Sequence, residues 1–177
     1  WSGYDGFAVG LSGDGWFRVE AGATSSGRYA VVGENYGATG TVEVEGTGSR
    51  WDNRHEIYLG QSGRATMTIS DGGQVTSRDA IVGRYSSGNG SAEITGAGSS
   101  WTTTGAFELG SAGTGALSVR DGGAVGSANA RIGYGYGAAG EAEVTGSGST
   151  WTNAGALDIG VSGGGALTIA DSGTVET

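Results

Sequence analysis

Two sets of carboxylates recur at a fixed interval along this 177-residue chain, and they are the first groups that suggest chemistry. They are Glu43, Glu93 and Glu143, and Asp71, Asp121 and Asp171. Paired carboxylates hydrolyse glycosidic bonds when they lie about 5 to 9.5 Å apart. Catalytic groups usually interrupt a repeat, however, whereas these follow it. The pattern therefore favours structural roles: the glutamates keep an outer face soluble, and the aspartates mark turns.

His55 is the only histidine of the chain, and its surroundings in the sequence do not suggest a catalytic triad. The segment from Asp52 to Glu56 differs from the corresponding residues of the next repeat, so it is a local variation. We predict a histidine in a surface loop, because a Ser-His-Asp triad also needs an oriented base and an oxyanion hole. A polysaccharide-cleaving loop would depart from the repeat in this way, but this segment is short and has no partner loop.

Other ligand chemistries lack the residues that they require. The absence of Cys excludes a thiolate metal site, and the absence of Lys argues against a phosphate-binding glycine loop. The Gly-Gly-x-Gly-x-Asp string of calcium-binding repeats is missing. Thr66 and Thr68 have the spacing of ice-binding threonines, but no regular array of such pairs forms. We therefore expect no metal, no cofactor and no enzymatic activity.

Aromatic side chains are the best candidates for recognition. Tyrosines occur mostly in loops or at outward positions of the pattern: Tyr29, Tyr36, Tyr58, Tyr85, Tyr134 and Tyr136. Four of them fall in one Gly-rich loop of alternate coils and are the predicted ligand-facing residues: Tyr36, Tyr85, Tyr134 and Tyr136. Aromatic faces bind sugars and proteins. In the alternative interpretation, the tyrosine rings pack over glycine backbone and the unusual Trp16 covers the end of a coil.

A fifty-residue repeat organises the whole sequence. It is clearest in the tryptophans, which stand at Trp1, Trp51, Trp101 and Trp151. We predict a single domain, 1–177, built from units 1–50, 51–100 and 101–150 with a partial unit 151–177. Because Trp1 lies in the middle of the pattern, we expect the chain to be a segment of a longer array.

Each unit contains short segments in which apolar and polar residues alternate, which is typical of β-strands. In the segment from Glu141 to Thr145, for example, the alanine and valine point one way and the glutamates the other. The sequence numbers of Gly110, Gly133 and Gly160 differ by 23 and then by 27, which predicts coils of these two lengths in alternation. We predict an all-β parallel solenoid, or β-helix, with about seven coils, three short strands per coil and almost no helix.

Stacking buries each inward residue on its counterpart in the next coil, so the core can be predicted as columns. One column is Val9, Val32, Leu59, Val82, Leu109, Ile132 and Ile159. A second, which we expect at a corner or on the third face, is Ser25, Trp51, Val75, Trp101, Val125, Trp151 and Val175. In two further columns large and small residues alternate, which suits interlocking layers.

The composition restricts the partners of this chain. It has 40 Gly, no Pro, no Cys and a formal charge of −9 at pH 7. High Gly without Pro or a three-residue period excludes collagen, and apolar residues at regular intervals argue against disorder. No basic cluster suits nucleic acid, and no run of about 20 apolar residues inserts into a membrane. The absence of Cys is compatible with an extracellular or periplasmic location.

The stretch GSGSTWTNAGALDIGVSGGGALTIADSGTV, from Gly146 to Val175, resembles repeats in the passenger regions of bacterial autotransporter (type V secretion) adhesins. The matching parts are the Gly-x-Gly-Ser-x-Trp, Leu-x-Ile-Gly and Leu-Thr-Ile-x-Asp-x-Gly elements. They recur in variant form after Trp51 and Trp101 and more loosely after Trp1, so the resemblance covers the whole chain. These elements include no active site of the family.

The resemblance implies a right-handed β-helix that is exported to the extracellular space or the bacterial outer-membrane surface. Family roles are adhesion, self-association and service as a rigid stalk. The expected partner is a glycan or protein on a host or neighbouring cell, or a second copy of the chain. The alternative function is that of a polysaccharide-cleaving or polysaccharide-binding β-helix protein.

Overall fold

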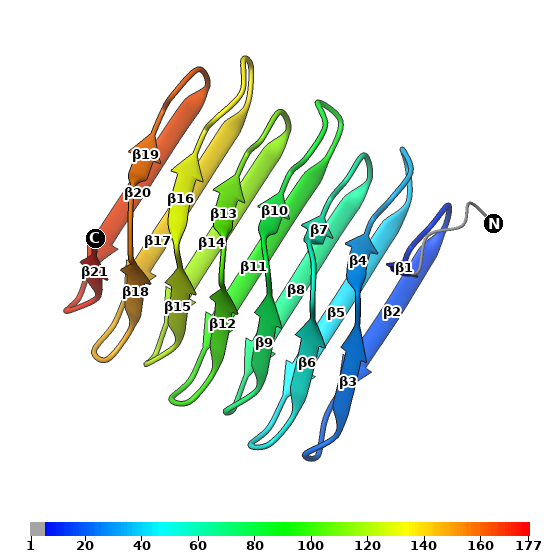
Figure 1. Ribbon diagram of the computed structural model, residues 1–177, viewed down its shortest axis with the longest axis horizontal. Coiled ribbons are helices and arrows are strands. Elements are labelled where there is room, and N and C mark those ends of the chain that lie inside the picture. Colours follow the sequence, from blue (N-terminus) through cyan, green and yellow to red (C-terminus); the bar gives the residue numbers. More distant parts are fainter. Residues whose placement is uncertain (1–5) are drawn as a thin grey trace.

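The computed structural model describes residues 6–177, and all regular structure in this range is β-strand. The strands form three parallel sheets that stack along one axis as a solenoid of seven coils (Figure 1). The predicted all-β solenoid with three strands per coil is therefore confirmed. Residues 6–177 contain no helix, and so none long and apolar enough to cross a membrane. Trp1 lies outside the described residues.

The three sheets, named A, B and C here, each contain one strand from every coil. Sheet A comprises β1 (Gly6–Val9), β4 (Tyr29–Val32), β7 (Ile57–Leu59), β10 (Ala80–Val82), β13 (Ala106–Leu109), β16 (Asn129–Ile132) and β19 (Leu157–Ile159). Sheet B comprises β2 (Asp14–Val19), β5 (Thr39–Glu45), β8 (Arg64–Ser70), β11 (Asn89–Thr95), β14 (Thr114–Arg120), β17 (Ala139–Thr145) and β20 (Gly164–Ala170). Sheet C comprises β3 (Thr24–Gly27), β6 (Arg50–Asn53), β9 (Gln74–Ser77), β12 (Ser100–Thr103), β15 (Ala124–Ser127), β18 (Thr150–Asn153) and β21 (Thr174–Glu176).

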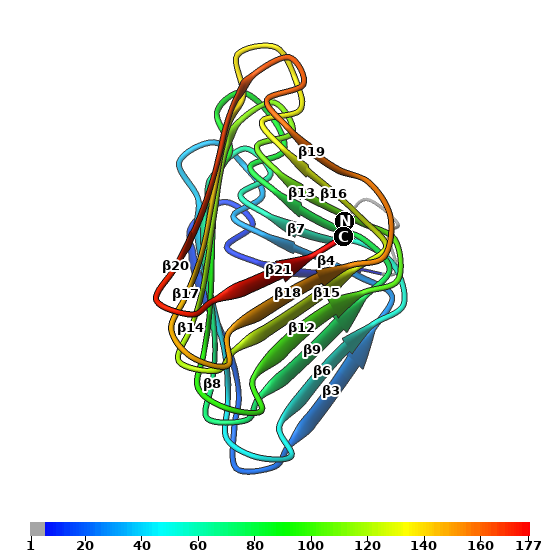
Figure 2. The same ribbon diagram turned by 90° about the vertical axis from the view of Figure 1, so that its left-hand side faces the viewer.

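The solenoid is right-handed. In Figure 1 the chain rises along sheets C and A at the front, descends along sheet B behind them, and advances toward the C-terminus. Figure 2 looks from the C-terminal end, and the chain turns anticlockwise as it approaches the viewer. This is the handedness that the resemblance implies.

The strand register places the inward residues in single files. In sheet A, Val9 pairs with Val32, and the file continues through Leu59, Val82, Leu109, Ile132 and Ile159. In sheet C, the file runs from Ser25 through Trp51, Val75, Trp101, Val125 and Trp151 to Val175. The tryptophans therefore lie on the third face and are buried. Ile159 belongs to the last coil and is 47% exposed.

The predicted alternation between shorter and longer coils holds in full only when coil length is counted along sheet A. Along sheet B every step from one coil to the next has the same length, as from Val44 to Ile69. Along sheet C longer and shorter steps still alternate but differ less, as from Ser25 to Trp51 and from Trp51 to Val75. Coils are numbered from the N-terminal end, so that β1, β2 and β3 form coil 1 and β4, β5 and β6 form coil 2. Counted along sheet A, each even coil is four residues longer than each odd coil, and these residues are distributed over all three turns instead of forming one protruding loop.

The interior balances large and small side chains within each coil. Every even coil carries a buried Trp in sheet C and small residues in sheets A and B, such as Ala80 and Ala92 beside Trp101. Every odd coil carries Val or Ser in place of Trp and larger residues in the other two sheets, such as Phe107 and Leu117. The Phe107 ring packs edge-on against Trp101 at 4.8 Å between centroids. Alternating coils therefore fill a channel of constant cross-section.

A second inward file at the end of sheet C is polar. It contains Gly27, Asn53, Ser77, Thr103, Ser127 and Asn153. Ser77 Oγ accepts a hydrogen bond from Trp101 Nε1 at 3.2 Å, and Ser127 Oγ accepts one from Trp151 Nε1 at 3.0 Å. These bonds satisfy the indole N–H groups inside an otherwise apolar core.

The turns use residues that tolerate a left-handed backbone. Between sheets B and C of the odd coils, Asp71 and Gly72 have φ of 52° and 88°, as the Asp-Gly pair predicts. At the same corner, the hydroxyl of the buried Ser99 accepts a hydrogen bond from the Gly72 N–H at 3.0 Å. Ser49 and Ser149 bond Gly22 and Gly122 in the same way. The serine of the Gly-x-Gly-Ser-x-Trp element therefore ties each even coil to the preceding coil.

Candidate functional site

The outer face of sheet A carries a mixed column of side chains, one from each coil. From the N-terminal end it contains Ala8, Val31, Tyr58, Ile81, Glu108, Arg131 and Asp158. Some positions fifty residues apart in this column differ strongly, as with Tyr58 and Glu108, whereas others are alike, as with Val31 and Ile81. The outer face therefore follows the repeat less closely than the buried face does.

A tyrosine–arginine cluster lies where this face meets the turns between sheets A and B. The Arg84 guanidinium carbon lies 4.2 Å from the ring centroid of Tyr58 and 4.8 Å from that of Tyr85. Arg84 Nη1 also donates a hydrogen bond to Gln61 Oε1 at 3.0 Å. Tyr58 lies on β7, whereas Arg84 and Tyr85 follow β10, so the cluster bridges two coils. Two cation–π contacts and a hydrogen bond fix the arginine in one orientation.

The cluster lines an open recess of about 400 Å³ on the surface of the solenoid. Its lining residues are Tyr29, Val31, Glu34, Glu56, Tyr58, Gln61, Arg84 and Tyr85. Tyr29, Val31 and Tyr58 come from β4 and β7 of sheet A, and the other lining residues come from connecting segments. The volume falls in the range of about 300 to 1,000 Å³ that is typical of small-molecule sites.

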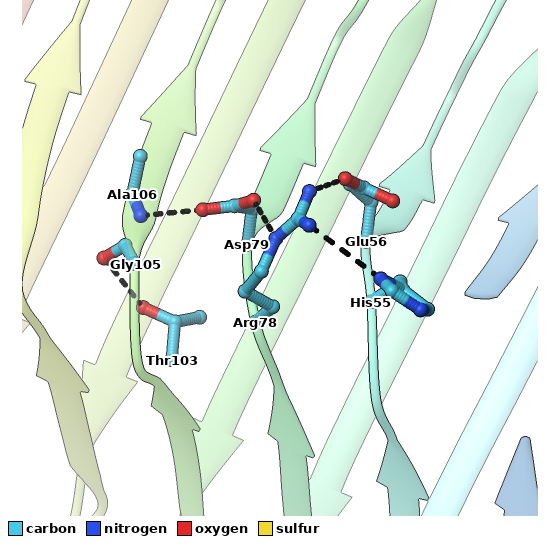
Figure 3. A network of polar contacts seen from close by, with 7 residues as sticks. All are labelled: His55, Glu56, Arg78, Asp79, Thr103, Gly105 and Ala106. Carbon is cyan, nitrogen blue, oxygen red and sulfur yellow. Dashed lines mark hydrogen bonds and ion pairs between the residues drawn. The ribbon is translucent and has the colours of Figure 1, made fainter. Parts of the chain in front are cut away.

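An ion-pair network holds Glu56 at the rim of this recess (Figure 3). Arg78 pairs with Glu56 and with Asp79, whose carboxylate lies 2.7 Å from Arg78 Nε. The second oxygen of Asp79 accepts a hydrogen bond from the Ala106 N–H at 2.8 Å, so three successive coils are joined. His55 Nδ1 lies 3.5 Å from Arg78 Nη1 at the edge of the network. His55 follows β6 in a connecting segment, as predicted.

The recess changes the acidity of Tyr58. Partial burial raises the pKa of the Tyr58 phenol above its ordinary value of 10.0, because the phenolate loses hydration. The positive charge of Arg84 acts in the opposite direction but is the smaller effect. Tyr58 is therefore a neutral hydrogen-bonding group at physiological pH.

A smaller version of the cluster occurs two coils further along. The Arg131 guanidinium carbon lies 4.8 Å from the Tyr134 ring centroid, and Arg131 Nη1 is 3.0 Å from Glu108 Oε1. Arg131 and Glu108 are neighbours in the outward column of sheet A. The same face thus presents an aromatic ring and a fixed ion pair at a second position.

The four tyrosines predicted to face a ligand all lie in the turns between sheets A and B, on one edge of the stack. Tyr36 and Tyr136 are 86% and 96% exposed, whereas Tyr85 and Tyr134 are 47% and 41% exposed. Only Tyr85 of the four lines the recess. Sequence reasoning identified Tyr29 and Tyr58 as outward aromatics but missed Glu34, Gln61 and Arg84. These three positions could have been recognised because their residues differ from one repeat to the next.

The outer face of sheet B carries the regular glutamates. Glu43, Glu93 and Glu143 occupy one column and alternate with Thr68 and Ser118. This alternation places successive glutamates two coils apart, about 9.6 Å by strand spacing. Glu93 pairs with Arg120, and Glu43 lies 3.4 Å from Arg18. A second shallow recess of about 420 Å³ follows this face past Glu141 and Glu143.

The corner aspartates have the turn conformation that the sequence predicts. Asp121 and Asp171 have φ of 53° and 47°. Each accepts a hydrogen bond at 3.2 Å from a threonine of the preceding coil, Thr95 or Thr145. Across residues 6–177, no three His, Asp or Glu side chains gather in a way that could hold a metal ion.

Together these features define a right-handed parallel β-solenoid with an aromatic and polar recess on sheet A. Comparisons with protein families, with curated proteins and with solved structures found no match to the chain.

Proposed function

We propose that this chain is a non-enzymatic adhesive segment of a cell-surface protein, displayed outside the cell or at the bacterial outer membrane. The observation that supports this function best is the continuous seven-coil stack, in which the described residues contain no protruding insertion. Each outward backbone position recurs every two coils, about 9.6 Å apart, whichever side chain it carries. The sequence resemblance to autotransporter passengers supports the surface location.

The mechanism follows from this repetition. A stiff rod holds its outer side chains at fixed spacings, so several weak contacts with one partner act together and increase the overall affinity. The exposed rings of Tyr36, Tyr85, Tyr134 and Tyr136 supply contact area along one edge of the rod. The partner is a glycan or protein on a host or neighbouring cell, or a second copy of the chain.

Binding and self-association assays test this proposal. The chain is applied to glycan arrays and to intact cells, and its oligomeric state is followed by sedimentation at increasing concentration. We expect binding or concentration-dependent association. Absence of both would identify the chain as a passive stalk and overturn the adhesive role.

An activity assay tests the non-enzymatic part of the proposal. The chain is incubated with soluble polysaccharides, and the release of reducing ends or unsaturated products is measured. We expect no release above the buffer control. Reproducible cleavage that scales with protein concentration would favour a polysaccharide-cleaving β-helix instead.

A further inference from the structure

We propose that the recess on sheet A is a binding site for an uncharged saccharide unit of a larger glycan. This inference rests on the adhesive function proposed above and names both its site and its ligand class. The recess combines aromatic rings with hydrogen-bond donors and acceptors within about 400 Å³.

The lining residues can contact both the apolar C–H face and the hydroxyl groups of a sugar. Tyr85 is 47% exposed and supplies aromatic surface on which the C–H face of a pyranose ring packs, and Tyr58 supports the Arg84 guanidinium beside it. Glu34 and Glu56 supply carboxylate oxygens that accept hydrogen bonds from sugar hydroxyls. Gln61 and Arg84 supply N–H donors for the hydroxyl and ring oxygens. Because the polar groups converge on a single recess, several can engage one sugar unit.

The charges of the recess are mixed, with a small negative excess that disfavours anions. The lining groups Glu34 and Arg84 carry opposite charges, and Glu56 is paired with Arg78, which also pairs with Asp79. The position between Tyr58 and Tyr85 that would suit an organic cation already holds the Arg84 guanidinium. An anion would meet two carboxylates and only one arginine. Charged ligands are therefore disfavoured relative to neutral hydroxyl-rich ones.

The groups are also preorganised. Arg84 is held by two rings and by the Gln61 side chain, and Glu56 is held by Arg78. Fixed side chains lose little conformational entropy when a ligand binds, which increases affinity. Such fixation around an open recess distinguishes this position from the freely exposed Tyr36 and Tyr136.

The recess is built where the sequence departs from its own repeat. Residues fifty positions further on are different in size or charge: Glu56 corresponds to Ala106, Tyr58 to Glu108, Gln61 to Ser111 and Arg84 to Tyr134. The buried positions of the same coils keep their apolar character, as with Leu59 and Leu109. Solenoid packing therefore does not require the particular outer residues that line the recess.

The repeat also supplies variants that should fold. Tyr58→Glu and Glu56→Ala each introduce the residue that the next repeat carries at the same register. Trp16→Thr is the matched control, because Trp16 is an exposed aromatic on sheet B and Thr66 stands at its place in the next repeat. Circular dichroism and thermal melting verify that each variant retains the fold.

The experiment measures binding of the wild-type chain and the three variants to immobilised neutral oligosaccharides. The probes are glucose-, galactose-, mannose- and N-acetylhexosamine-based oligomers, with sialylated and sulfated glycans as charged comparisons. The Kd of the best probe is then measured in solution by calorimetry. We expect a neutral probe to bind wild type and Trp16→Thr equally, and Tyr58→Glu and Glu56→Ala about tenfold or more weakly.

Several results would overturn the assignment. Equal binding by wild type and folded Tyr58→Glu would place the saccharide elsewhere on the rod, with the adhesive function intact. Binding of charged glycans alone, or adhesion only to proteins or to other copies of the chain, would also reject the neutral-saccharide site while keeping the adhesive role. Failure of the wild type in every adhesion assay would remove both proposals.

Discussion

At the residue scale, Tyr58 shows how a residue that departs from the repeat gains contacts that its counterparts lack. Its backbone position is set by the same strand register as Glu108 and Asp158, but its ring lies against Arg84 from the next coil. The contact partly desolvates the phenol and fixes the arginine. An exception in a tolerant outward column can thus contribute to a site without altering the core.

Titration of Tyr58 is the first prediction at this scale. Because its pKa is raised in the folded chain, the folded state retains the phenolic proton above pH 10.0, where an unfolded Tyr ionises. The contribution of Tyr58 to stability is unchanged below that pH and decreases as pH rises through the folded pKa. The difference in phenolate absorbance between wild type and Tyr58→Phe should therefore show a midpoint above 10.0. A midpoint at or below 10.0 would contradict the desolvation argument.

Asn53 is the second residue-scale case. The residue is 5% exposed, and neither polar atom of its amide finds a hydrogen-bond partner among the described residues. In the equivalent position two repeats later, Ser127 Oγ donates to Asn153 Oδ1 at 2.8 Å and accepts from Trp151 Nε1. The residue that corresponds to Ser127 in the first unit is Gly27, which has no side chain to supply that bridge.

We therefore expect Gly27→Ser to stabilise the chain. A Cβ at Gly27 would meet only Asn53 Oδ1, at 3.3 Å, so the hydroxyl can be accommodated with a small adjustment. The new hydrogen bond should raise the free energy of unfolding by about 1 kcal/mol. Denaturant titration measures the change, with Gly27→Ala as the control for the added carbon. If both variants were equally stable, the hydroxyl bridge would not form.

At the element scale, each coil must fill the interior left by its neighbours. The tryptophans of sheet C occupy even coils, whereas the large residues of sheets A and B occupy odd coils. Phe107 lies between the two layers that contain Trp101 and Trp151, with centroid distances of 4.8 and 5.8 Å. Loss of one large side chain therefore affects the coils on both sides.

Trp101→Ala tests this packing. The substitution removes a fully buried ring, and small neighbours such as Ala80 and Ala92 cannot fill the space. It also leaves Ser77 without its indole partner. We expect the free energy of unfolding to fall by about 3 to 5 kcal/mol, as for other large-to-small changes in cores. A loss below about 1 kcal/mol in denaturant titration would show that the stack relaxes around the site.

At the scale of the whole molecule, stability comes from contacts between neighbouring coils. Each coil packs on the next through three parallel strand pairs, and the described residues contain no interaction that spans the length of the stack. Inner strands such as β11 are paired on both sides, whereas β1 and β20 are paired on one side. Repeat proteins of this kind behave as chains of nearest-neighbour interactions.

Amide hydrogen exchange should reflect this arrangement. We expect the slowest exchange in β8, β11 and β14, and faster exchange in β2 and β20, because terminal coils open without disrupting the rest of the stack. Mass spectrometry of peptic fragments from the intact chain measures the gradient. Uniform protection across all seven strands of sheet B would show that the solenoid opens only as a single unit.

The sequence by itself determined the solenoid, its strand register and its corner residues. Period-two alternation fixes which side chains point inward, and an uninterrupted fifty-residue repeat fixes which inward residues stack. Val82, Leu109 and Ile132 could therefore be placed in one file from their spacing alone. The Asp-Gly turns followed from the backbone conformation that those residues tolerate.

Only the tertiary structure decided which outer side chains meet and how neighbouring coils divide the interior volume. Tyr58, Gln61 and Arg84 belong to two coils and meet because their coils are adjacent and their side chains are long enough to cross the gap. The compensation between Trp101 and Phe107 likewise joins different sheets of different coils. Alternation along a strand indicates which side chains share one face of a sheet. It does not indicate which turns or sheets come into contact, because that depends on how each coil closes in three dimensions.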